Sequence, residues 1–95
     1  MWCMTIQSNE IEKRPCVYII RCSDESLYTG WTNNLEGRIE AHNKGLGAKY
    51  TRGRRPVALV YVEYFLNKSE AMRREATIKK YTHMEKKKLL ESKSK

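Results

Sequence analysis

The chain has 95 residues, and 19 Lys and Arg against 11 Asp and Glu give it a formal net charge of +8. This length allows one domain with a small core, and the positive surplus favours a polyanionic partner. No apolar run reaches the roughly 18 residues of a membrane span, and residues 1–15 lack the apolar segment of a signal peptide. Three cysteines without CxxC spacing argue against a disulfide framework and a zinc ribbon. We therefore expect a reduced, cytoplasmic protein that binds no membrane.

The globular part is expected to begin with a β-hairpin. Residues 16–22 are rich in β-branched and aromatic side chains and predict a strand. Residues 23–26 have the composition of a turn, and residues 27–31 predict the returning strand. Residues 1–14, which are mixed and polar, are expected to form an N-terminal arm.

The length of the hairpin loop decides whether Tyr18 and Tyr28 share a face of the sheet. They do so if the numbers of paired residues add up to an even value, as a three-residue loop at 23–25 would require. A four-residue loop would place them on opposite faces, and the sequence allows both. Gly30 lies on the same face as Tyr28 and leaves room there for another group to approach the backbone.

A helix and a cationic loop are predicted next. Asn33 and Asn34 can cap a helix whose apolar residues recur at helical spacing as far as Leu46. Residues 44–56 have no apolar periodicity, but they contain five basic residues and three glycines. This composition predicts a mobile cationic loop.

The last third of the chain predicts one strand and two helices. Residues 57–65 are apolar enough for a central strand, and capping boxes open helices at 67–81 and 82–90. The order β-β-α-β-α-α predicts an α+β fold, a three-stranded mixed or antiparallel sheet flanked by helices. We expect one domain over residues 15–90, followed by a basic tail at 91–95.

Three charged or polar residues lie where apolar residues are expected. Arg38 and His42 lie along the apolar stripe of the first helix, and Glu75 lies on the stripe of the second. A carboxylate that faces a core is costly unless it is paired or binds a metal. An Arg38–Glu75 ion pair, or side chains that extend to solvent, would explain these placements without any function.

Together these positions resemble the GIY-YIG endonuclease superfamily. The resemblance covers residues 15–90 and is carried, in chain order, by Tyr18, Tyr28, Gly30, Asn34, Arg38, His42 and Glu75. The chain looks most similar to the small stand-alone bacterial branch, the YhbQ-like proteins. It departs from the motifs in the family name at Cys16, where the name has Gly, and at Thr29, where it has Ile.

The resemblance implies a magnesium- or manganese-dependent phosphodiesterase that acts on DNA. Glu75 would be the one protein ligand of the metal, which is chemically reasonable because Mg²⁺ keeps several waters and accepts few carboxylates. Tyr18 or Tyr28 would activate the attacking water, with nearby cations lowering a tyrosine pKa that is ordinarily about 10. Arg38 would bind phosphate oxygens, and His42 matches the position of a polar helper.

The cationic loop is the predicted surface for nucleic acid. Its candidate contact residues are Lys44, Lys49, Tyr50, Arg52, Arg54 and Arg55. A solvated, flexible connection is the alternative for this loop. The lysines near the C-terminus are instead expected to form a solvated helix face and tail, with nonspecific attraction to phosphate as their alternative role. The rival function is a nucleic-acid-binding module with little or no catalysis, and RNA remains open as a substrate. Since no targeting domain is evident, we expect recognition of DNA shape or a protein partner that selects the target.

Overall fold

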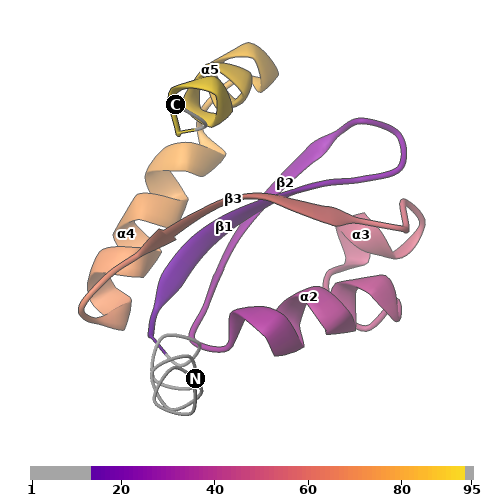
Figure 1. Ribbon diagram of the computed structural model, residues 1–95, viewed down its shortest axis with the longest axis horizontal. Helices are drawn as coiled ribbons and strands as arrows, with labels where there is room; N and C mark the ends of the chain where they lie inside the picture. The colour runs from indigo at the N-terminus through magenta and orange to yellow at the C-terminus, as the bar shows by residue number, and fades with distance from the viewer. Residues whose placement is uncertain (1–13, 94–95) are drawn as a thin grey trace, which may run out of the picture.

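The computed structural model describes residues 14–93, so almost all of the predicted N-terminal arm lies outside the described residues. The three strands are β1 (Cys16–Arg21), β2 (Leu27–Thr32) and β3 (Ala58–Tyr64). The helices are α2 (Leu35–Asn43), α3 (Lys49–Arg52), α4 (Lys68–Lys79) and α5 (His83–Lys93), as Figure 1 shows. The predicted α+β fold, with a three-stranded sheet flanked by helices, is confirmed.

The sheet is antiparallel with the strand order β2-β1-β3. The prediction that residues 57–65 form a central strand is therefore wrong, because β1 is the central strand and β3 lies at an edge. Five consecutive residues of β1, from Cys16 to Ile20, are buried, as expected of a strand that is covered on both faces. Several residues of β3 are exposed, including Leu59 at 40%.

The hairpin has the three-residue loop, one of the two alternatives that the sequence left open. The amide of Cys22 donates to the carbonyl oxygen of Ser26 at 2.9 Å, and Glu25 adopts a positive φ of 72° in the loop between them. Tyr18 pairs with Gly30 and Ile20 pairs with Tyr28. Tyr18, Tyr28 and Gly30 therefore lie on one face of the sheet.

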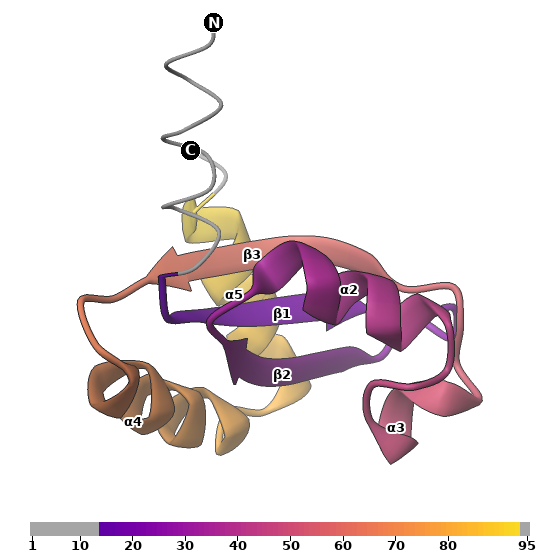
Figure 2. The same cartoon turned by 90° about the horizontal axis from the view of Figure 1, so that it is seen from below.

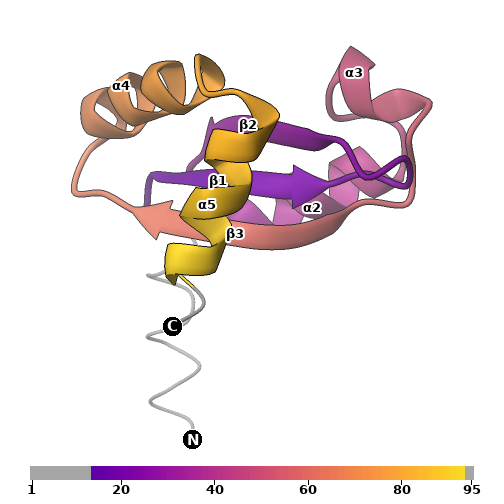
Figure 3. The same cartoon turned by 90° about the horizontal axis from the view of Figure 1, so that it is seen from above.

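Helices cover the two faces of the sheet, with α2 on one side and α5 on the other (Figures 2 and 3). The core on the α2 side includes Tyr18, Ile20 and Leu35, together with the thiols of Cys16 and Cys22. The core on the other side joins β1 to α4 and α5. Its buried members are Val17, Ile19, Tyr61, Ala71 and Ile78. The central strand thus contributes alternate side chains to two separate cores.

The predicted helix caps are confirmed. The side chain of Asn34 accepts a hydrogen bond from the amide of Gly37, and that of Asn67 accepts one from Glu70. In α5 both halves of the capping box form, because Glu85 bonds the amide of Thr82 at 2.8 Å and Thr82 bonds that of Glu85 at 3.1 Å. Local sequence chemistry therefore sets where these helices begin.

The segment at 44–56 is more ordered than predicted, since it contains the short helix α3. Helix α2 ends at Asn43, so Leu46 lies beyond it and is 73% exposed instead of extending its apolar stripe. Helix α4 ends at Lys79, and α5 continues past Leu90 to Lys93. No helix among residues 14–93 is long and apolar enough to cross a membrane.

Candidate active site

The site is built around the hydroxyl of Tyr18 in the central strand. Tyr18 is only 1% exposed, and its hydroxyl oxygen lies 2.9 Å from Nε2 of His42. Arg38, one helical turn before His42 on α2, donates from Nε to the same hydroxyl at 3.4 Å. The stripe on which these polar residues stand therefore faces Tyr18, and they are hydrogen-bonded within the fold.

His42 is fully buried and both of its ring nitrogens are hydrogen-bonded. Nε2 contacts Tyr18, and Nδ1 lies 2.8 Å from the hydroxyl of Thr51 on α3. The Thr51 hydroxyl donates in turn to the carbonyl oxygen of Ala48 at 3.1 Å. These contacts form a continuous chain from the backbone of the α3 segment to the hydroxyl of Tyr18.

Burial shifts the pKa values of this pair in opposite directions. It raises the pKa of Tyr18 above its usual value, and the nearby Arg38 only partly opposes this effect. Burial lowers the pKa of His42, and the positive charge of Arg38 lowers it further. A neutral phenol therefore meets a neutral imidazole at neutral pH.

Tyr28 lies beside this pair in a group of aromatic rings. Its ring centre is 5.4 Å from that of His42 in an edge-on arrangement, and it stacks on Tyr50 of α3 at 5.7 Å. The ammonium group of Lys79 lies 5.9 Å from the centre of the Tyr28 ring. Tyr28 therefore connects the α2–α3 side of the site to α4.

Glu75 comes to the site from α4, and the structure pairs it with Lys79 instead of Arg38. Its Oε2 lies 3.3 Å from Nζ of Lys79, and its side chain is 19% exposed. The pKa of Tyr18, raised chiefly by burial, is raised slightly more by the charge of Glu75. The carboxylate thus acts electrostatically on the hydroxyl at the centre of the site.

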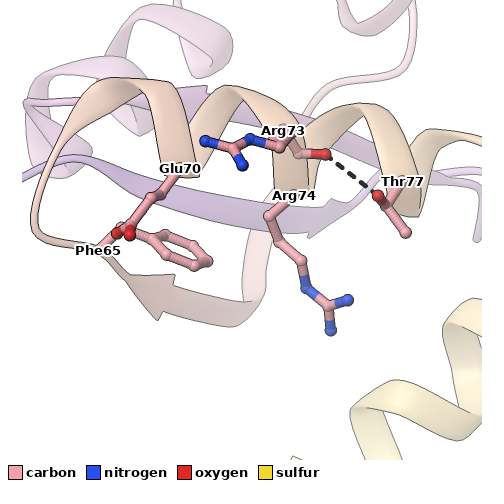
Figure 4. A pocket seen from close by; sticks show the side chains of 5 residues that line it. All are labelled: Phe65, Glu70, Arg73, Arg74 and Thr77. Atoms are coloured by element: carbon pink, nitrogen blue, oxygen red, sulfur yellow. Dashed lines mark hydrogen bonds between the residues drawn. The ribbon is translucent and has the colours of Figure 1, made fainter.

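An ion pair between α4 and β3 fixes the helix that carries Glu75. Arg74 donates from Nε to Oε1 of Glu63 at 2.8 Å, and the hydroxyl of Tyr61 donates to the other carboxylate oxygen at 3.2 Å. Figure 4 shows Arg74 in the pocket that it lines with Phe65, Glu70, Arg73 and Thr77. None of these pocket residues was among the candidate site residues.

A single carboxylate with oxygen donors is a suitable ligand for a hard divalent cation that keeps most of its water. Glu75 fits that requirement, although a cation there would compete with the ammonium group of Lys79. No group of three or more potential metal-ligating His, Cys, Asp or Glu side chains occurs within residues 14–93. The residues present fit one weakly coordinated ion and not an all-protein metal cage.

The candidate residues for nucleic acid differ in what they do in the fold. Lys49 and Arg52 are exposed on α3. Arg54 bonds Asp24 of the hairpin turn at 3.0 Å and lies over the ring of Tyr50, so it ties two loops together. Arg55 bonds the carbonyl oxygens of Arg52 and Asn43, and Lys44 pairs with Glu40 on α2.

The space predicted at Gly30 is occupied by Tyr18. A Cβ at Gly30 would lie 2.6 Å from the Tyr18 hydroxyl oxygen, so only glycine leaves room for that group. Asn34 acts as the cap of the helix that carries Arg38 and His42. These two predicted structural residues therefore support the Tyr18 cluster directly.

Sequence reasoning did not single out two residues that contact the cluster. Thr51 stands in a segment without periodicity, so nothing local marks its burial. Lys79 was not distinguished from the many other lysines near the C-terminus. Its spacing of four residues after Glu75, which is typical of a helical ion pair, was the available signal.

Comparison with known families identifies the arrangement. The family model of the GIY-YIG catalytic domain matches residues 14–88, which is most of the chain. The chain belongs to the GIY-YIG family. Membership implies a nuclease and hence a nucleic-acid substrate, and GIY-YIG nucleases generally depend on a divalent metal.

Relatives of this GIY-YIG chain match along most of their length. A UPF0213 protein of Clostridium perfringens is 68% identical over 78 residues, covering 82% of this chain and 84% of that protein. A UPF0213 protein of Staphylococcus haemolyticus is 60% identical over 75 residues, covering 79% and 92%. These names state no activity.

Two NMR structures share the fold. The UPF0213 protein from Bacillus halodurans superposes with a TM-score of 0.57 at 45% identity, covering 84% of this chain and 85% of that chain. A protein from E. faecalis gives a TM-score of 0.60 at 40% identity, covering 87% and 88%. The GIY-YIG fold assigned here therefore agrees with structures determined in solution.

Proposed function

We propose that this chain is a divalent-metal-dependent DNA endonuclease that hydrolyses phosphodiester bonds and recognises DNA structure more than sequence. The observation that carries the proposal is the convergence of Tyr18, His42 and Arg38 in one hydrogen-bonded cluster. Glu75 is joined to this cluster through Lys79, whose ammonium nitrogen lies 3.3 Å from the carboxylate and 5.9 Å from the centre of the Tyr28 ring. These are the residue types that water activation, phosphate binding and metal binding require.

Each residue then has a separate task. Glu75 would hold Mg²⁺ or Mn²⁺, which when bound polarises the phosphate and stabilises the leaving oxygen. Arg38 binds the phosphate oxygens with its remaining guanidinium donors. Tyr18 is the better candidate of the two tyrosines to accept the proton of water, because its hydroxyl oxygen lies 2.9 Å from Nε2 of His42, a nitrogen that could take the hydroxyl proton in turn.

Tyr28 and the α3 cations are proposed to position the DNA. Tyr28 is less buried than Tyr18 and can orient the attacking water or the phosphate. Lys49 and Arg52 are the proposed backbone contacts, since the other three cations of the loop already hold Glu40, Asp24 or backbone carbonyls. DNA geometry, or a protein partner, would then select the cleavage position.

The ion pair between Glu75 and Lys79 favours one alternative, a nucleic-acid-binding module without significant catalysis. A carboxylate whose charge is already balanced by a lysine of the same helix does not need a metal. Such a module would retain DNA or RNA through its cations and leave it intact. Both functions predict salt-sensitive binding, so cleavage is the discriminating measurement.

The test is incubation with nicked, flapped and branched DNA in Mg²⁺, Mn²⁺ or EDTA, for the wild type and for Glu75→Ala. We expect the wild type to cleave only with metal, and Glu75→Ala to lose cleavage while binding DNA almost as well. Glu70→Ala removes an exposed carboxylate from the same helix and should cleave normally. Equal cleavage by Glu75→Ala and the wild type would refute the site assignment, and retention of DNA without cleavage by the wild type would support the module.

We also propose that the protein acts in the cytoplasm. Cys16 and Cys22 are free and buried thiols on the α2 side of the sheet. Burial raises the pKa of Cys16 to about 11, so this thiol is poorly reactive at neutral pH. A reducing compartment suits such packing cysteines.

A further inference from the structure

Thr51 is the least expected member of the buried cluster. It lies in the four-residue helix α3, is 0% exposed, and contacts Nδ1 of His42 at 2.8 Å. A neutral histidine carries one ring proton, and the partner of one nitrogen determines which nitrogen has it. The direction of the Thr51 hydroxyl therefore matters for what His42 can do to Tyr18.

The backbone fixes that direction. The Thr51 hydroxyl donates its only proton to the carbonyl oxygen of Ala48 at 3.1 Å. Its oxygen can then only accept from His42, which places the ring proton on Nδ1. Nε2 is left with a lone pair 2.9 Å from the hydroxyl of Tyr18, whose oxygen already accepts from Arg38.

We propose that Thr51 is a positioning residue that holds His42 in the tautomer whose Nε2 accepts the hydroxyl proton of Tyr18. This inference rests on the proposed endonuclease function for its effect on rate, but the tautomer itself does not depend on that function. In the hydrolytic step, water gives a proton to the Tyr18 oxygen as the Tyr18 proton moves to Nε2 of His42. The water oxygen bonds to phosphorus, the bond to the leaving oxygen breaks, and that oxygen takes a proton from solvent.

Groups from every neighbouring element surround His42. Arg38 lies on the same helix, Tyr18 and Tyr28 face it from the strands, and Thr51 faces it from α3. From α4, the charge of Glu75 acts on Tyr18. Both hydrogen-bond partners of the ring are neutral hydroxyls, so neither supplies a negative charge that would hold His42 as an imidazolium before the reaction.

The first test reads the tautomer by NMR of the histidine ring nitrogens in the metal-free protein at neutral pH. The chain has two histidines, and His42→Gln assigns the signals. We expect the wild-type His42 to be protonated on Nδ1, and Thr51→Val to lose that single preference. Protonation of wild-type His42 on Nε2, or an unchanged tautomer in Thr51→Val, would overturn the proposal.

The second test reads DNA cleavage at saturating substrate. Thr51→Val should lower the maximal rate about tenfold with little change in apparent DNA affinity, which is the typical effect of losing one buried hydrogen bond. Thr51→Ser, which restores the hydroxyl, should return the rate to within about twofold of the wild type. Failure of the serine variant to recover the rate would contradict a role for the hydroxyl.

Thr29→Val is the matched control. Thr29 is also a buried threonine, at 2% exposure, but its hydroxyl has no hydrogen-bond partner among the described residues. This variant should keep both the tautomer and the rate. If the tautomer changes in Thr51→Val but the wild type cleaves no DNA, the endonuclease proposal fails while the positioning of His42 stands.

Discussion

At the scale of single residues, the hydroxyl of Thr29 is the clearest local imperfection. It stands next to Tyr28, opposite Ile19 of the central strand, and is buried without a hydrogen-bond partner among residues 14–93. A buried hydroxyl that has lost water without gaining a partner destabilises the folded state. The motif in the family name has an apolar Ile at this position.

We therefore predict that Thr29→Val stabilises the protein by about 1 kcal/mol. Valine keeps the shape and the β-branching of threonine and removes the unsatisfied group. Urea unfolding followed by circular dichroism should show a higher midpoint at an unchanged slope. A midpoint equal to or below that of the wild type would mean that the hydroxyl has a partner, such as an ordered water.

The catalytic candidates could be predicted at this scale because their chemistry is conspicuous at their positions. Arg38, His42 and Glu75 are polar residues at positions where helical periodicity expects apolar ones. Thr51 could not be found in this way, since a threonine in a polar segment is unremarkable until the fold buries it. Its role depends on the contact between α2 and α3, which no local pattern encodes.

At the scale of elements, α3 presents a different kind of residue on each side. Lys49 and Arg52 are exposed, Tyr50 stacks on Tyr28, and Thr51 contacts His42. Four residues are too few for a helical period to be visible in the sequence. The sequence therefore predicted that this segment is cationic, but not that it contains an ordered helix.

We predict that Lys49→Gln and Arg52→Gln each weaken DNA binding without destabilising the fold. A lost phosphate contact releases one fewer counterion, so the slope of log Kd against log salt should fall by about 1 for each variant. The measurement is fluorescence anisotropy in EDTA over a series of salt concentrations. Lys68→Gln removes a charge from the start of α4, at the other end of the molecule (Figure 1), and should keep the wild-type slope.

Equal slopes for Lys68→Gln and the α3 variants would mean that only the net charge counts. Arg54 is unsuitable for this comparison because its bonds to Asp24 and Tyr50 connect two loops. Its replacement would change the fold and the charge together.

The position of a strand in the sheet could not be predicted from the sequence of that strand alone. Residues 57–65 are the most continuously apolar segment, yet β3 is an edge strand and β1 is central. The hydrophobicity of a segment indicates how much of a strand can be buried. The position of that strand in the sheet also depends on which strands it pairs with and which faces the helices cover. The order of elements along the chain was predictable, but their order in the sheet was not.

At the scale of the whole molecule, the buried histidine links stability to pH. The pKa of His42 is lowered in the folded state by burial and by Arg38, so below about pH 6.5 the unfolded chain binds a proton that the native protein does not. The contribution of neutral His42 is therefore fully present above pH 6.5. It is lost progressively as the pH falls toward the lowered pKa of the folded state.

We predict that the free energy of unfolding of the wild type decreases between pH 7 and pH 5, and that His42→Gln flattens part of this decrease. Urea titrations at a series of pH values provide the measurement. His83→Gln replaces the other histidine, which is exposed, and controls for the loss of a histidine side chain as such. If the free energy of unfolding depended on pH in the same way in His42→Gln and the wild type, His42 would not be the group that links stability to pH.

The Tyr18–His42 pair also depends on two residues without side chains. A Cβ at Gly30 would collide with the Tyr18 hydroxyl, and one at Gly47, in the segment between α2 and α3, would overlap the ring of His42. A saturation-mutagenesis screen for cleavage would therefore score both glycines as essential, although neither has a side chain that could donate a proton, accept one or bind a metal. At these two positions the requirement is for empty volume, so intolerance to substitution in this small protein would map the shape of the active site as well as its chemistry.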